Sequence, residues 1–299
     1  MHGFGVALAA KLLNKPYVLS VDADFLYEHD FLGISHSNIE RLIASLTAKL
    51  NYRAADAIIC VSEATKNHLV SFYKISKEKI FVIPNSAFPQ RFPSQHEIFE
   101  IKGKLNLINT TTIMFVGNFW PWHDIELLIN SFEYVHTHKP QSRLVLIGAG
   151  ITREIIVNIV NEKKLSDYVV FTGKVLHQQV PLYLGMADIV IAPYPKMDVE
   201  FWGSPMKIFE YMAAGKAIIA TQAGQIGEIL SNENNALLVT PGDVKEMSSS
   251  IIRLIEDPVL RNILGNNAYK QFLQKYTWEN YIKKLTNVYE YVDRLSIEN

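Results

Sequence analysis

The stretch FWGSPMKIFEYMAAGKAII (201–219) begins as a loop, continues with helical spacing and ends in a short apolar run. A helix that leads directly into a buried strand is the repeating unit of a parallel sheet covered by helices. The same alternation of helices and short strands runs along the chain from about residue 3 onward. The sequence therefore predicts an α/β fold.

The second half of the chain has enough strands for a complete doubly wound sheet. The predicted strands are 112–116, 143–147, 168–171, 188–192, 217–220 and 236–239. The predicted helices between and after them are 124–137, 152–163, 178–185, 206–214 and 243–256, and a long helix follows at 277–296. We expect this half to form a Rossmann-like domain.

The first half offers only three strand candidates, at 16–21, 55–60 and 79–83. Its predicted helices are 3–14, 38–53 and 63–73. Half of a sheet is thus missing, and a parallel sheet normally has both faces covered and its edges protected. We expect a further upstream segment of order 80 residues, or a partner chain, to supply the rest.

Domain boundaries follow from the proline-rich stretch 84–109, which separates the two groups of strands. We predict a partial first domain at 1–88, a linker at 89–109, a second domain at 110–276 and a terminal helix at 277–299. We expect this last helix to pack back toward the first domain.

Composition narrows the class of protein. The chain has 299 residues, 48% of them hydrophobic and 20% charged, with a formal net charge of −1. This balance is typical of a globular protein and gives no reason to expect a nucleic-acid partner. The single cysteine, Cys60, rules out a disulfide framework within the chain and favours a cytoplasmic setting. No apolar run is long enough to span a bilayer, which leaves open peripheral association with the inner face of a membrane.

The residues after each strand carry the chemistry, because ligands bind at the carboxyl ends of strands in such sheets. In GSPMK (203–207), glycine and Pro205 stand at a helix entrance, where free N–H groups and the helix dipole attract an anion. Lys207 is unfavourable in a first helical turn unless an anion offsets it. Glu210 follows on the same face and can accept hydrogen bonds from two sugar hydroxyls. A phosphate site beside a hydroxyl site predicts a nucleotide ligand.

An ordered set of phrases resembles glycosyltransferase family 4, retaining enzymes of the two-Rossmann (GT-B) type. The phrases are VSEATKNHL (61–69), KIFVIPNS (79–86), FVGNFWPWHDIELLINSF (115–132), LVLIGAG (144–150), VVFTGKVLHQQVPLYLGMADIVIAPY (169–194), SPMKIFEYMAAGKAIIAT (204–221) and LLVTPGD (237–243). Each phrase is weak alone, but together they cover essentially residues 55–280.

The resemblance implies roles for individual residues. Glu210 would bind the donor ribose, Lys207 would face the diphosphate and Val175 would contact the base. Trp202 stands where the family has its first signature glutamate, and Asn118 and His123 stand where it usually has arginine and lysine. Neutralisation of the diphosphate would then rest on Lys207 and backbone N–H groups, with His123 as a possible aid. The expected donor-binding residues are Gly117, Asn118, His123, Val175, Gly203, Ser204, Pro205, Met206, Lys207 and Glu210.

On the acceptor side, the strand PYVLSV ends at Asp22, where the family often has a histidine. A carboxylate there could orient the acceptor hydroxyl or stabilise positive charge on the sugar, and a simple turn residue is an equal alternative. Glu28 and His29 are weaker candidates. Three tryptophans that flank the expected cleft, Trp120, Trp122 and Trp202, could stack on a sugar, although packing is the commoner role.

The resemblance implies transfer of a sugar from a nucleotide sugar to a sugar or lipid-linked acceptor, in polysaccharide or glycolipid synthesis. The catalytic candidates are Asp22 and Lys207, and neither a metal nor another cofactor is expected. Two alternatives stay open: a nucleotide-sugar epimerase of the same fold, and a truncated nucleotide-sugar-binding protein without activity of its own.

Overall fold

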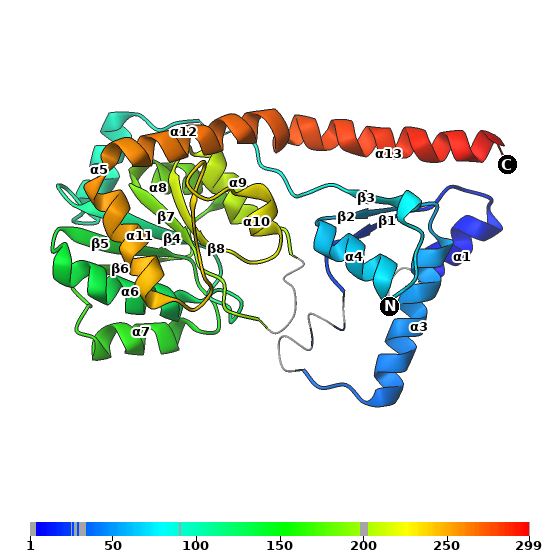
Figure 1. The fold of residues 1–299 in the computed structure, drawn as a ribbon, viewed down its shortest axis with the longest axis horizontal. Coiled ribbons are helices and arrows are strands. Elements are labelled where there is room, and N and C mark those ends of the chain that lie inside the picture. The colour runs from blue at the N-terminus through cyan, green and yellow to red at the C-terminus, as the bar shows by residue number, and fades with distance from the viewer. Residues whose placement is uncertain are drawn as a thin grey trace. The chain divides into compact units, whose positions relative to one another are not determined.

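The computed structural model of the chain describes residues 4–24, 26, 29, 34–89, 91–197 and 203–298. Glu28 and Trp202, both named above, and the first residue of the predicted helix 3–14 lie outside these residues. The chain forms two compact units (Figure 1). Unit 1 contains residues 1–86, 200–204 and 278–299, and unit 2 contains residues 87–199 and 205–277. The expected α/β architecture with two Rossmann-like sheets is confirmed.

Unit 1 has a three-stranded parallel sheet in the order β1-β2-β3. Its strands are β1 (Val18–Val21), β2 (Ala57–Cys60) and β3 (Ile80–Val82), with Val18 beside Ala57 and Ile58 beside Ile80. In the described part of the chain before residue 87, the helical elements with defined bounds are α1 (Phe4–Leu12), α3 (Asn38–Ala54), α4 (Glu63–Ser71) and the short 3-10 helix η1 (Lys77–Lys79). All three strands predicted in this region are therefore present.

The last helix of the chain, α13 (Trp278–Glu298), belongs to unit 1. Its Val288 and Val292 are buried in one apolar cluster with Ala57, Ile59 and Ile83. The ring of Tyr291 also packs edge-on against Phe81, with centroids 5.1 Å apart. The expectation that the terminal helix packs back on the first domain is confirmed, because burial of this apolar stripe holds it there.

Unit 2 has a six-stranded parallel sheet in the order β6-β5-β4-β7-β8-β9. In chain order its strands are β4 (Thr111–Val116), β5 (Ser142–Ile147), β6 (Val169–Gly173), β7 (Ile189–Ala192), β8 (Ala217–Thr221) and β9 (Leu237–Val239). This is the strand order of a doubly wound dinucleotide-binding fold, and its topological switch point lies between β4 and β7. The six strands that the sequence predicts are all present.

Helices cover both faces of this sheet. In Figure 1, α6 (Ile125–His138) and α7 (Arg153–Glu162) lie below the strands, whereas α8 (Val180–Met186), α9 (Met206–Ala213) and α12 (Pro258–Lys275) lie above them. The remaining helical elements of the unit are α5 (Gln95–Lys104), η2 (His177–Gln179), α10 (Gln225–Ile229) and α11 (Val244–Glu256). The central strand β7 is apolar and buried throughout, and β4 is buried from its second residue onward, as sheets covered on both faces require.

The structure places a helix, α5, within the stretch 89–109 that the sequence predicts to be a linker. Ser94 and Glu97 form a capping box in which each side chain accepts a hydrogen bond from the other residue's backbone N–H. The prolines of this stretch all come before the cap, so they mark the approach to the helix. Two further helices, α10 and α12, were not predicted. No helix in the described part of the chain is long and apolar enough to cross a membrane.

Candidate functional site

Lys207 is a charged residue that is buried in unit 2. It is the second residue of α9, whose first turn begins after Pro205 with no side-chain cap. The residue is only 7% exposed, and its ammonium group lies 4.0 Å from the centroid of the Phe115 ring and 5.6 Å from that of Tyr194. Among the described residues, its Nζ atom has no hydrogen-bond partner. Burial holds the pKa of Lys207 well below its usual range, and the nearby Glu210 charge acts in the opposite direction.

Gly117 makes room for this ammonium group. It follows β4 with φ = 153°, a conformation that side chains rarely adopt. A Cβ atom at this position would lie 2.7 Å from Lys207 Nζ. A Cβ on Gly148 would in turn lie 1.9 Å from the Gly117 carbonyl oxygen. The loops after β4 and β5 therefore pack backbone against backbone, and Lys207 reaches the end of β4 because no side chain stands there.

Glu210 lies on α9 three residues after Lys207. Its side chain is 13% exposed, and one carboxylate oxygen is 3.7 Å from Nδ1 of His177, a largely exposed residue of η2. Burial raises the pKa of Glu210, while His177 and Lys207 favour its charged form. Sequence reasoning did not find His177, although its position shortly after β6 was an available signal.

His123 lies in the loop between β4 and α6, where several aromatic rings hold it. Its ring packs edge-on against Phe115 at 5.5 Å and Tyr194 at 5.3 Å between centroids, and its Nδ1 lies 2.6 Å from the Asn118 carbonyl oxygen. Burial first, and then the Lys207 charge, lower the pKa of His123 to about 3, although its contact with Asn118 acts against them. His123 and Lys207 thus contact the same two rings.

The other expected donor residues of unit 2 lie after β4, after β6 and at the start of α9. Asn118 is exposed directly after Gly117, and Val175 is half-buried in the loop after β6. Pro205 occupies the N-cap position of α9, and Met206 is its first residue. The structure thus brings His123 and Lys207 together against the rings of Phe115 and Tyr194, with Gly117 beside the Lys207 ammonium group.

Gly203 and Ser204 belong to unit 1, and the chain passes into unit 2 at Pro205. The Ser204 hydroxyl accepts a hydrogen bond from the Asn85 backbone N–H (3.0 Å), and the Asn85 side-chain amide donates to the Ser204 carbonyl (2.8 Å). Asn85 follows β3, and the sequence alone did not single it out. These bonds fix the segment just before α9 to unit 1.

Two aspartates follow β1 in unit 1, and their surroundings differ. Asp22 is exposed, and its charge together with burial raises the pKa of Tyr281 on α13, burial being the larger cause. Asp24 is 6% exposed, and its Oδ2 accepts a hydrogen bond from the Tyr73 hydroxyl (2.6 Å) and lies 3.3 Å from Nε2 of His68. Its Oδ1 accepts from the backbone N–H of Leu26 at 2.9 Å.

Two of the tryptophans considered above stack on each other. The rings of Trp120 and Trp122 lie 5.0 Å apart with an angle of 8° between their planes. Both are half-buried in the loop after β4, next to His123. Within the described ranges, no group of three or more His, Cys, Asp or Glu side chains is placed to hold a metal ion.

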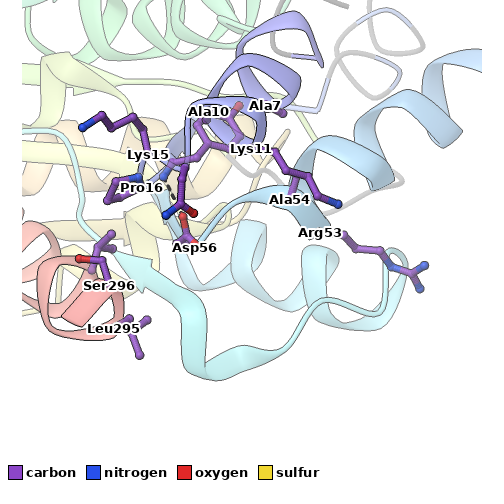
Figure 2. Close-up of a pocket in the computed structure, with 13 residues that line it drawn as sticks. Ala7, Ala10, Lys11, Lys15, Pro16, Arg53, Ala54, Asp56, Leu295 and Ser296 are labelled. Carbon is purple, nitrogen blue, oxygen red and sulfur yellow. Dashed lines mark hydrogen bonds between the residues drawn. The ribbon is translucent and has the colours of Figure 1, made fainter. Parts of the chain in front are cut away.

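Unit 1 has a cavity of about 730 Å³ of its own (Figure 2). It lies beside the starts of β1 and β2, because Pro16 and Tyr17 precede β1 and Asp56 precedes β2. Lys11, Lys15 and Arg53 also line it. The Asp56 carboxylate accepts a hydrogen bond from the Tyr17 N–H at 2.8 Å. In Figure 2 the basic side chains point in different directions instead of converging on one point.

Comparison with known proteins gives two family matches. Residues 1–91 match the family described as Glycosyltransferase Family 4, and residues 110–257 match the family described as glycosyl transferases group 1. An uncharacterized glycosyltransferase of Methanocaldococcus jannaschii is 26% identical over 93% of this chain and 70% of its own length. The chain spans only 60% of the length of two further glycosyltransferases from that organism.

More distant relatives have specific names. An Escherichia coli protein named UDP-Gal:alpha-D-GlcNAc-diphosphoundecaprenol alpha-1,3-galactosyltransferase is 21% identical over 94% of this chain and 71% of its own length. Among solved structures, Anabaena HepE in complex with UDP and glucose superposes with a TM-score of 0.78 and 21% identity. The match covers 96% of this chain and 74% of that one, and it establishes a shared fold.

Proposed function

The chain belongs to the GT-B glycosyltransferases, with a family 4 domain followed by a group 1 domain, and we propose a donor and a reaction for it. We propose that it transfers a sugar from a nucleotide-sugar donor to an acceptor hydroxyl with retention of configuration. Unit 2 would hold the donor, at the ends of β4, β6 and β7.

One observation carries the proposal: a buried ammonium group without a hydrogen-bond partner in the described chain, at the first turn of a helix. An uncompensated buried charge is costly, so Lys207 calls for an anionic ligand. The free N–H groups of the first turn of α9 would add to its attraction for a phosphate. The donor diphosphate meets both requirements, and Lys207 would stabilise the charge that develops as it leaves.

Glu210 would bind the ribose of the same donor. Its carboxylate is one turn further along α9, and an ionised carboxylate accepts hydrogen bonds from both hydroxyls of a diol. The 3.7 Å approach of His177 favours that ionised form. Val175 would contact the base, as the resemblance implies.

On the acceptor side we retain Asp22, because it is an exposed carboxylate directly after β1. The acceptor proton would pass to the departing phosphate on the same face of the sugar, and no metal would be required. The name of the Escherichia coli relative describes a lipid-linked diphosphate acceptor. It supports an acceptor of that kind, in polysaccharide or glycolipid synthesis, for this chain.

A thermal-shift panel of UDP-, GDP- and ADP-sugars tests the donor assignment, because a ligand that binds the native state raises its apparent stability. The nucleotide that stabilises the wild type is then titrated against Glu210→Ala. Loss of hydrogen bonds to a charged group should weaken binding about tenfold or more. Glu162→Ala, on the exposed side of α7, is the matched control and should bind normally.

Turnover is measured on the same preparations, with and without acceptor. Transfer requires an acceptor, whereas an epimerase would convert the donor alone. A wild-type protein that no nucleotide sugar stabilises would refute the proposed function. Equal nucleotide affinity in wild type and Glu210→Ala would refute only the ribose assignment.

A further inference from the structure

Three aromatic rings and one backbone carbonyl contact the His123 ring. Phe115 and Tyr194 contact it edge-on at angles of 69° and 71°, and Trp122 does so at 75° with 6.3 Å between centroids. The 2.6 Å contact between Nδ1 and the Asn118 carbonyl then fixes rotation in the ring plane. The imidazole is therefore held in one position.

The Asn118 contact also fixes where the proton lies. A carbonyl oxygen can only accept a hydrogen bond, so Nδ1 must carry the hydrogen and donate it. In a neutral imidazole the other nitrogen, Nε2, is then an acceptor. The described chain provides no hydrogen-bond donor to Nε2.

The charges that face His123 favour this neutral form. Lys207 on α9 shares the Phe115 and Tyr194 rings with it and opposes a second positive charge. The adjacent carboxylate of Asp124 does not pair with it, because Asp124 caps α6 by accepting from the Leu127 N–H at 3.0 Å. Burial and Lys207 together lower the pKa of His123 to about 3. The ring is thus uncharged at physiological pH.

We propose that His123 recognises a hydroxyl group of the transferred sugar through Nε2, and that Lys207, not His123, contacts the diphosphate. This rests on the proposed function and makes it more specific. A non-bridging phosphate oxygen and a neutral Nε2 are both acceptors and repel each other. A sugar hydroxyl is a donor and fits. The sugar adjoins the diphosphate, as His123 adjoins Lys207 across the shared rings.

Three substitutions separate sugar recognition from phosphate binding. His123→Gln keeps an acceptor atom, His123→Phe keeps the ring without one, and His123→Lys supplies a cation that can only donate. Calorimetry measures affinity for UDP and for UDP-glucose, or for GDP and GDP-mannose if the panel selects that base. The ratio of the two affinities reports the sugar contact, and urea unfolding confirms that each variant is folded.

We expect His123→Gln to keep the wild-type ratio of the two affinities. His123→Phe should lose about tenfold in nucleotide-sugar affinity, while its affinity for the nucleoside diphosphate stays unchanged. His123→Lys should bind the nucleoside diphosphate at least as tightly as wild type, but it should lose the preference for the nucleotide sugar over the nucleoside diphosphate. Between pH 5.5 and 8, wild type and His123→Gln should show the same pH dependence of nucleotide-sugar affinity.

Three outcomes would overturn the assignment. Full activity and sugar preference in His123→Lys, or equal losses of both ligands in His123→Phe, would make His123 a phosphate ligand. Normal affinities in all three variants would make it a packing residue. Wild-type protein that binds neither ligand would instead refute the proposed function beneath it, which Glu210→Ala tests separately.

Discussion

Two buried charged side chains, one in each unit, have opposite surroundings. Asp24 in unit 1 receives hydrogen bonds from a tyrosine hydroxyl and a backbone N–H and lies against a histidine. Lys207 in unit 2 is equally buried, yet its ammonium group contacts aromatic ring faces and has no hydrogen-bond partner in the part of the chain described. A buried charge with partners supplied by the fold stabilises that fold. A buried charge without them costs stability and indicates a ligand.

The largest effect should come from Lys207→Met, which removes this charge and keeps the volume. Transfer should fall about a hundredfold, as it does when one donor to developing negative charge is lost. The free energy of unfolding should stay unchanged or rise, because a costly buried charge is replaced by an apolar chain. Steady-state kinetics and urea unfolding measure the two effects.

Lys216→Met is the matched control for this change. The Lys216 ammonium donates to the carbonyls of Gly185 and Ala187, and burial lowers its pKa to about 8. Its removal should destabilise unit 2 and leave the chemistry of folded protein intact. If Lys207→Met were destabilising and fully active, the contrast between the two groups would be wrong.

Asp24→Ala should have the opposite profile to Lys207→Met. It leaves Tyr73 and His68 without their buried partner, so we expect a loss of about 2 kcal/mol in the free energy of unfolding. Nucleotide affinity, a property of unit 2, should not change. The neighbouring Asp22→Asn should leave the free energy of unfolding unchanged and lower only the rate of transfer. An Asp24→Ala protein as stable as wild type would count against a structural role for Asp24.

Gly117→Ala should disturb the Lys207 site from the side of β4. The added Cβ would lie 2.7 Å from the ammonium group and would have to adopt a positive φ of 153°. We expect a loss of about 1 to 2 kcal/mol in stability, together with weaker nucleotide binding. Gly242→Ala, where a Cβ meets nothing within 4 Å but φ is also positive, isolates the conformational cost. Equal nucleotide affinities in the two variants would show that Gly117 does not make room for Lys207.

The smallest effect concerns protons. Burial lowers the pKa of Lys207 in the free protein, and a bound diphosphate should raise it again. Between these two pKa values, binding takes up a proton, so affinity should weaken as pH rises through that window and be level below it. Calorimetry in buffers of different ionisation enthalpy measures this uptake. Lys207→Met should show none, and uptake that persists in this variant would assign the proton elsewhere.

The strands could be predicted from the sequence because buried parallel strands are short apolar runs. Ile189–Ala192 and Ala217–Thr221 are examples, and both are fully buried. Helix α5 was missed because prolines before Ser94 suggested a linker, although Ser94 and Glu97 carry a capping signal. The local sequence at these places was sufficient, but one of its signals was misread.

The site was only partly predictable, because the roles of its residues depend on contacts between residues that are distant in the sequence. Lys207 and Glu210 stand out at a helix entrance in the sequence. Nothing in the sequence around His123 indicates that its Nδ1 faces a carbonyl, or that it shares two rings with a lysine 84 positions away in the chain. Likewise, Asp22 and Asp24 look alike in the sequence, and only the folded chain shows that one is exposed and the other buried.

The place of α13 in unit 1 has a consequence for folding during synthesis. Ala57 and Ile59 are made early, whereas Val288 and Val292, which cover them, leave the ribosome after the whole of unit 2. At about 5 to 20 residues per second, the apolar face of the first sheet would wait about 10 to 40 s for its covering helix. During that interval the nascent chain would carry a complete group 1 domain and an incomplete unit 1. Chaperones could bind the uncovered apolar face of the unit 1 sheet.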